Sequence, residues 1–96
     1  MTATTTAPRY ALNVRLVEND KSYAMTAGDR WRNEELCLAA GYNWLNSFGD
    51  NHPSIKAEEI TKAFLTLRQT GLCQLSTRRR GRKVTLVVQV AVAGEE

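Results

Sequence analysis

The sequence predicts an α+β protein: a β-hairpin, two α-helices and a second β-hairpin form a four-stranded antiparallel sheet with both helices packed on one face. Near both ends of the chain, apolar residues alternate with polar ones, as they do in half-buried strands. In the middle they recur every three to four residues, as on helices packed against a core. Because 96 residues suffice for only one core, we expect a single domain over residues 9–93, preceded by a flexible arm over residues 1–8.

The first hairpin is predicted from two alternating segments, residues 10–16 and 23–27. Between them, Asn19-Asp20 is a typical turn sequence. A turn there brings every large apolar side chain of both segments to one face of the hairpin. The expected pairs are Leu16 with Tyr23, Val14 with Met25, and Leu12 with Ala27.

The first helix is expected after Gly28, with Asp29 or Asn33 as its N-cap and an end near Phe48. Acidic residues in its first turn suit the positive end of the helix dipole. Gly41 inside this helix indicates a kink or a close approach to a neighbour. The expected buried positions are Cys37 or Leu38, Gly41, Trp44 or Leu45, and Phe48.

The second helix is predicted to be capped by Ser54 and to end at Gly71 in a left-handed conformation. With that ending, Leu72 can pack back on Leu67. One apolar stripe runs along the helix and is expected to face the core. Its members are Ala57, Ile60, Ala63, Phe64 and Leu67.

The second hairpin is predicted over residues 72–92, folded back about Arg80-Gly81. This register pairs Leu75 with Leu86 and Cys73 with Val88 on the inner face, and leaves the arginines at the tip and on the outer face. The residues of its last strand expected to point inward are Val84, Leu86, Val88, Val90 and Val92.

Charge is concentrated in one short segment. The net charge is +3, but five cations occupy six positions in RRRGRK: Arg78, Arg79, Arg80, Arg82 and Lys83. The other eight Lys and Arg are outnumbered by ten Asp and Glu, so the remainder carries −2. Such a cluster attracts polyanions, although a solvated turn is the alternative interpretation.

Two further groups of residues are candidates for binding. Arg68, near the end of the second predicted helix, is expected to extend the basic patch. In Arg30-Trp31-Arg32 an aromatic ring between two cations could stack on a base or anchor a protein interface, unless Trp31 belongs to the core.

No residue pattern indicates catalysis, and we expect no enzyme, cofactor or metal. His52 is the only histidine, and no Walker or dinucleotide-binding glycine loop occurs. The adjacent acids Glu34-Glu35 and Glu58-Glu59 splay apart on helices and form no acid–base dyad. Cys37 and Cys73 lie in apolar segments without metal-ligand spacing, as buried thiols do.

Residues 60–88, ITKAFLTLRQTGLCQLSTRRRGRKVTLVV, resemble the end of a winged-helix DNA-binding domain, where a recognition helix runs through a Gly-Leu step into a basic wing. The resemblance implies groove contacts from Lys56, Thr61 and Arg68. It also implies phosphate contacts from the five cations of RRRGRK. The chain departs from that family at its start, where a full hairpin is predicted and a winged helix has a short strand among three helices.

We therefore expect a small, non-catalytic protein that binds nucleic acid, or a complex containing it, through the basic hairpin tip. The alternative is a phage- or plasmid-encoded inhibitor of the anti-CRISPR type, which binds a host nucleoprotein such as a CRISPR effector complex and blocks target DNA. The chain begins without a basic and apolar signal segment and has no long apolar run, so we expect a cytoplasmic location and no membrane partner.

Overall fold

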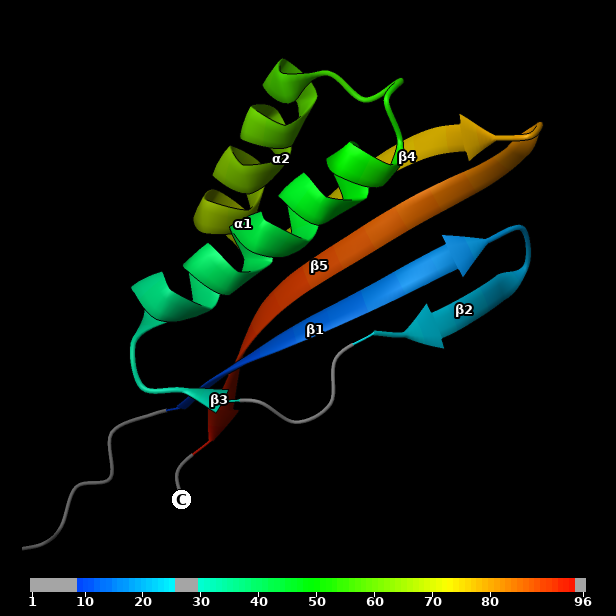
Figure 1. The fold of residues 1–96 in the computed structure, drawn as a ribbon. Helices are drawn as coiled ribbons and strands as arrows, with labels where there is room; N and C mark the ends of the chain where they lie inside the picture. Colours follow the sequence, from blue (N-terminus) through cyan, green and yellow to red (C-terminus); the bar gives the residue numbers. More distant parts are fainter. Residues whose placement is uncertain (1–8, 26–29, 95–96) are drawn as a thin grey trace, which may run out of the picture.

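The computed structural model describes residues 9–25 and 30–94. Within these ranges, five strands and two helices follow one another (Figure 1). They are β1 (Arg9–Glu18), β2 (Lys21–Ala24), β3 (Arg30–Trp31), α1 (Glu34–Asn51), α2 (Ala57–Thr70), β4 (Leu72–Arg79) and β5 (Arg82–Gly94). The predicted arm over residues 1–8 and the predicted partner Ala27 lie outside the described residues.

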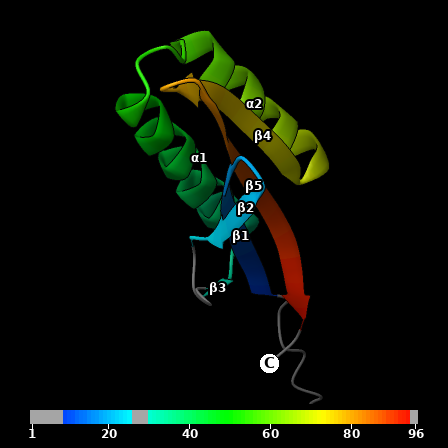
Figure 2. The same ribbon diagram turned by 90° about the vertical axis from the view of Figure 1, so that its right-hand side faces the viewer.

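The four longer strands form one antiparallel sheet in the order β2-β1-β5-β4. Both helices cover the same face of it, packing on β1, β4 and β5 (Figures 1 and 2). The predicted α+β architecture is therefore confirmed. The central pair joins the first strand of the chain to the last, with Val14 opposite Val88 and Leu16 opposite Leu86.

One strand was not predicted. In β3, Arg30 pairs with Ala11 and Trp31 with Tyr10, on the edge of β1 that β2 also uses nearer the turn. A segment of two residues is too short to show an alternating pattern, and Arg30-Trp31 forms a strand only because the start of β1 lies beside it. The first helix consequently begins at Glu34, several residues after Gly28.

Both hairpin registers agree with the prediction. In the first, Leu16 pairs with Tyr23 and the Met25 amide donates to the Val14 carbonyl at 2.8 Å. In the second, Leu75 pairs with Leu86 and Cys73 with Val88. Arg80 and Gly81 form the second turn with φ of 53° and 80°, the left-handed conformation that two-residue hairpin turns require.

The core lies between the sheet and the helices, and most of the predicted inward positions are buried in it. Some are not: Ala57, the first residue of α2, is exposed, and Val92 near the end of β5 is 65% exposed. Tyr23 and Met25, expected on the apolar face of the first hairpin, are exposed too. These residues lie near the end of an element or at the edge of the sheet, where the facing layer supplies fewer neighbours. The largest fully buried side chains are Val14, Cys37, Leu45, Leu67, Leu86 and Val88.

The helix ends differ in part from the prediction. Asn33 caps α1 by accepting from the Glu35 amide at 2.7 Å, and α1 continues past Phe48 to Asn51. Ser54 does not cap α2, because its hydroxyl is hydrogen-bonded to that of Thr77 on β4 at 2.5 Å. The α2 N-terminus is held by the Glu59 carboxylate, which accepts from the Lys56 amide at 2.8 Å.

The end of α2 is formed as predicted. Gly71 has a φ of 81°, and its amide donates to the Leu67 carbonyl at 2.8 Å. The Gly71 carbonyl accepts from the Val90 amide, which ties this turn to the sheet. Leu72, expected to pack back on Leu67, begins β4 and is 44% exposed.

Gly41 lies at a close approach between α1, α2 and the sheet. A Cβ at this position would lie 2.8 Å from Leu67 Cδ2 and 3.4 Å from Val88 Cγ1. Both neighbours are buried, so neither can move aside without disturbing the core.

We expect Gly41→Ala to lower the free energy of unfolding even though alanine favours helix. The gain in helix propensity is about 0.5–1 kcal/mol, whereas overpacking a filled core costs about 1–3 kcal/mol. The packing cost therefore wins. Urea unfolding measures the change, and Asn43→Ala on the exposed side of α1 is the control that gains stability. A more stable Gly41→Ala protein would contradict this packing.

The two thiols are buried and free. Burial raises the pKa of Cys73 from 9.0 to about 11. Burial, aided by the charge of Glu34, also raises the pKa of Cys37. Ionisation of either thiol therefore occurs more readily in the unfolded chain.

Both thiols should accordingly react slowly with a thiol reagent at neutral pH and rapidly in denaturant. Because the folded pKa of Cys73 is raised, its contribution to stability is complete below pH 9.0 and is lost as pH rises through about 11. The free energy of unfolding, measured across this pH range, should show the loss. The Cys73→Val variant should lack the portion of this pH dependence that comes from Cys73. Equally fast labelling of native and denatured protein would show that the thiols are accessible.

Candidate functional site

The basic segment forms the end of the second hairpin, and both hairpin turns lie at the same end of the sheet (Figure 1). The Asn19 amide of the first turn donates to the Lys83 carbonyl beside the second turn at 3.4 Å. We call Arg78, Arg79, Arg80, Arg82 and Lys83 the tip cluster. All five side chains are exposed.

The residues of the tip cluster are divided between the two faces of the hairpin and its turn. Arg78 is paired with Lys83 and Arg79 with Arg82, and Arg80 lies in the turn. Because side chains alternate along a strand, Arg79 and Arg82 share the face of Cys73, Leu75 and Val84, on which the helices pack. We expected the arginines only at the tip and on the outer face, so the placement of these two is a correction. It follows from the alternation of side chains along β4, which can be counted from the sequence.

The tip cluster is largely without internal counterions. A Glu18 carboxylate oxygen lies 3.7 Å from an Arg82 guanidinium nitrogen, and both side chains are exposed (65% for Arg82 and 38% for Glu18). Exposed pairs of this kind contribute about 0–1 kcal/mol. Among the described residues, the other four cations have no carboxylate within 4.0 Å.

On the outer face, Arg78 and Lys83 are neighbours of polar and small side chains. Ser76 and Thr85 form the next pair along this face toward the sheet centre, and their hydroxyls are hydrogen-bonded at 2.9 Å. Arg15 projects from β1 on the same face, because it pairs with Val87. By register, the outward positions of the described strands from 11 to 17, 72 to 78 and 83 to 91 include no acid.

On the helix side, two hollows adjoin the tip cluster. The first, of about 380 Å³, is lined by Glu18, Arg79, Arg80 and Arg82. The second, of about 280 Å³, lies between the end of α1 and the sheet. Its lining is largely apolar and aromatic, and Arg79 lines both hollows. The other residues of the second hollow are Leu16, Met25, Trp44, Ser47, Phe48, Asn51, His52 and Leu86.

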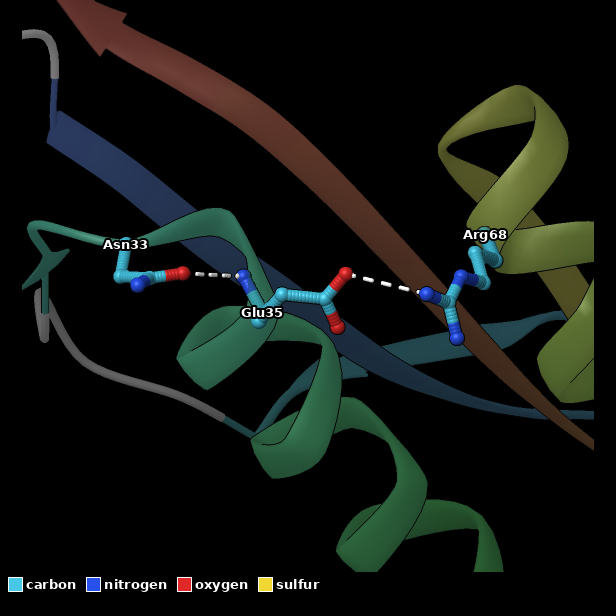
Figure 3. A network of polar contacts seen from close by, with 3 residues as sticks. All are labelled: Asn33, Glu35 and Arg68. Carbon is cyan, nitrogen blue, oxygen red and sulfur yellow. Dashed lines mark hydrogen bonds and ion pairs between the residues drawn. The ribbon is translucent and has the colours of Figure 1, made fainter.

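Arg68 does not extend the tip cluster. It lies near the end of α2, next to the start of β4, whereas the tip cluster begins with the last two residues of β4. Its guanidinium donates to a Glu35 carboxylate oxygen at 3.1 Å, and the Glu35 amide donates to the Asn33 side chain (Figure 3). Arg68 thus joins the end of α2 to the start of α1, at the opposite end of the sheet from the tip.

The second candidate group is also remote from the tip. Trp31 pairs with Tyr10 at the start of β1 and packs, partly buried, against the core. This placement agrees with the alternative that Trp31 belongs to the core. Arg32 is exposed in the connection to α1, and of Arg30 only the backbone pairing with Ala11 is described.

Neither helix has the length and apolar character that crossing a membrane requires. No three His, Cys, Asp or Glu side chains of the described ranges come together as a metal site. The His52 ring donates from Nδ1 to the Phe48 carbonyl at 2.9 Å, so this nitrogen is engaged locally. Sequence reasoning missed Glu18 and the hollow beside Trp44, which only the packing of distant segments brings to the tip cluster. It also missed Arg15 on the outer face of β1.

Comparisons with protein-family models, with curated proteins and with solved structures found no match to this chain. The topology also departs from the winged-helix resemblance, since two helices follow three strands in the described residues. Of the residues that resemblance assigns to a groove, Arg68 pairs with Glu35 and the Thr61 hydroxyl donates to the Ala57 carbonyl. The fold therefore gives this assignment no support.

The contacts in Figure 3 predict unequal effects on stability. Asn33→Ala removes the cap of α1 and should lower the free energy of unfolding by about 1 kcal/mol. Arg68→Ala removes an exposed ion pair and should cost less than about 1 kcal/mol. Urea unfolding of both variants tests the order. A larger loss for Arg68→Ala would mean that the ion pair is central to helix packing.

Proposed function

We propose that this protein is a small, non-catalytic module that binds nucleic acid, alone or within a nucleoprotein complex, through the tip cluster. The observation that carries the proposal is the arrangement of five exposed cations around one tight turn, with a single exposed carboxylate, Glu18, paired to one of them. Cations held this close together repel one another, and a polyanion would relieve that repulsion.

The geometry supports phosphate binding in particular. Guanidinium groups can hold phosphate oxygens by two parallel hydrogen bonds, and four of the five cations are arginines. A two-stranded β-ribbon also fits the major groove of B-form DNA. A ribbon entering a groove would meet phosphates on both sides, and the tip cluster has cations on both of its faces.

The first experiment removes three members of the tip cluster together: Arg78→Ala, Arg80→Ala and Lys83→Ala. A matched variant carries Arg32→Ala, Lys56→Ala and Lys62→Ala, three exposed positions elsewhere. Both variants change the net charge from +3 to 0, so they differ only in where the charge is lost. Binding to fluorescent duplex DNA, duplex RNA and single strands is measured by anisotropy at several salt concentrations.

We expect the tip variant to bind far more weakly and to lose about 2.7 units of log–log salt slope on B-form DNA, or about 0.9 for each phosphate contact. The matched variant should retain most of the affinity and slope. Equal losses in the two variants would show that total charge, and not the tip, governs binding. If naked nucleic acid binds weakly and one host nucleoprotein is captured from nuclease-treated lysate through the tip, the inhibitor alternative is favoured instead.

A further inference from the structure

We infer that the hollow beside Trp44 receives one unstacked nucleobase of a single-stranded nucleic acid, while Arg79, Arg80 and Arg82 hold the adjoining phosphate. This inference rests on the proposed function and narrows its ligand from nucleic acid in general to strands with an unpaired base.

The two hollows meet at one side chain. Arg79 lines both the cationic hollow and the apolar one. A ligand that fills both therefore needs an anionic group joined directly to an apolar part. A nucleotide has this construction, with a phosphate next to a flat base.

The walls of the apolar hollow suit a flat base. Trp44 is only partly buried and supplies aromatic surface, and Leu16 and Leu86 line the hollow from the sheet. Every base has a π face, so stacking on an aromatic side chain accepts any sequence. The volume of about 280 Å³ is at the small end for ligand pockets, which suits one ring system better than a larger molecule.

The same hollow also contains groups that can hydrogen-bond a base. Asn51 Nδ2 donates to the Ser47 carbonyl at 3.0 Å, which leaves Asn51 Oδ1 as an acceptor. His52 Nδ1 donates to the Phe48 carbonyl, which leaves Nε2 as an acceptor in the neutral ring. A base can hydrogen-bond such groups along its edge. An aliphatic side chain of a protein partner would leave them unpaired, at a cost.

The test compares two short single strands of equal length, one of ordinary sequence and one of abasic deoxyribose phosphates. A Trp31→Phe background leaves Trp44 as the sole tryptophan, since the chain has two. We expect the ordinary strand to quench the Trp44 emission. It should also bind roughly 5- to 150-fold more tightly than the abasic strand, the range that stacking of one base provides.

Trp44→Leu should remove this preference, while Tyr42→Leu, an exposed aromatic of α1 outside the hollow, should keep it. Because Trp44 packs against the core, circular dichroism must first show that its variant folds. If the variant does not fold, the binding of the ordinary and abasic strands to protein with Trp44 intact still tests the inference.

Equal binding of both strands with unchanged Trp44 emission would overturn the inference. Salt-dependent binding that still needs the tip cluster would then leave the proposed function standing. If neither strand binds but duplex DNA still binds through the tip cluster, the inference falls and the proposed function stands. If no nucleic acid binds, both fall. Quenching by a Glu-rich peptide with one leucine, but by neither strand, would assign the hollow to a protein partner and would also overturn the inference.

Discussion

The pairing of β1 with β5 is the interaction on which the rest of the structure depends. It extends from Arg9 opposite Gly94 to Glu18 opposite Val84 and joins the first strand of the chain to the last. Closing a loop this long costs conformational entropy, which burial of Val14 and Val88 against the helices offsets. Each hairpin then adds its second strand to one side of the central pair. Because both strands turn at the same end, the two turns meet there.

The proximity of the two hairpin turns explains which charges lie next to one another at the tip. Glu18 ends β1 and lies near Arg82, which begins β5, although 64 positions separate them in the sequence. The pairs Arg78–Lys83 and Arg79–Arg82 place like charges directly opposite one another, which is unfavourable in a sheet. Exposure of these side chains to water and salt makes the repulsion tolerable. A cluster with so little internal compensation retains most of its field for an external anion.

The helices give the two ends of the sheet different chemistry. At one end, the start of α1 and the end of α2 are joined through Glu35 and Arg68, so these two charges form an ion pair within the molecule (Figure 3). At the other end, the last turns of α1 leave an aromatic hollow against Arg79. Largely unpaired cations and partly exposed aromatic surface therefore occur together at the tip end.

The sequence by itself determined the local parts of this protein. Alternation and the turn residues were sufficient for both hairpin registers, because pairing across a short turn is specified by neighbours along the chain. The stripe on α2, its stop at Gly71 and the exposed tip cluster also depend on local pattern and composition. The alternation of side chains along β4 also places Arg79 on the face that the helices cover.

Only the tertiary structure decided which strands lie side by side, because many arrangements bury the same apolar faces. It made a strand of Arg30-Trp31, whose two residues carry no pattern until β1 lies next to them. It separated Arg68 from the tip cluster by the length of β4 and brought Glu18 and Trp44 to the tip. Such contacts depend on distances between segments remote in sequence, which periodicity cannot encode.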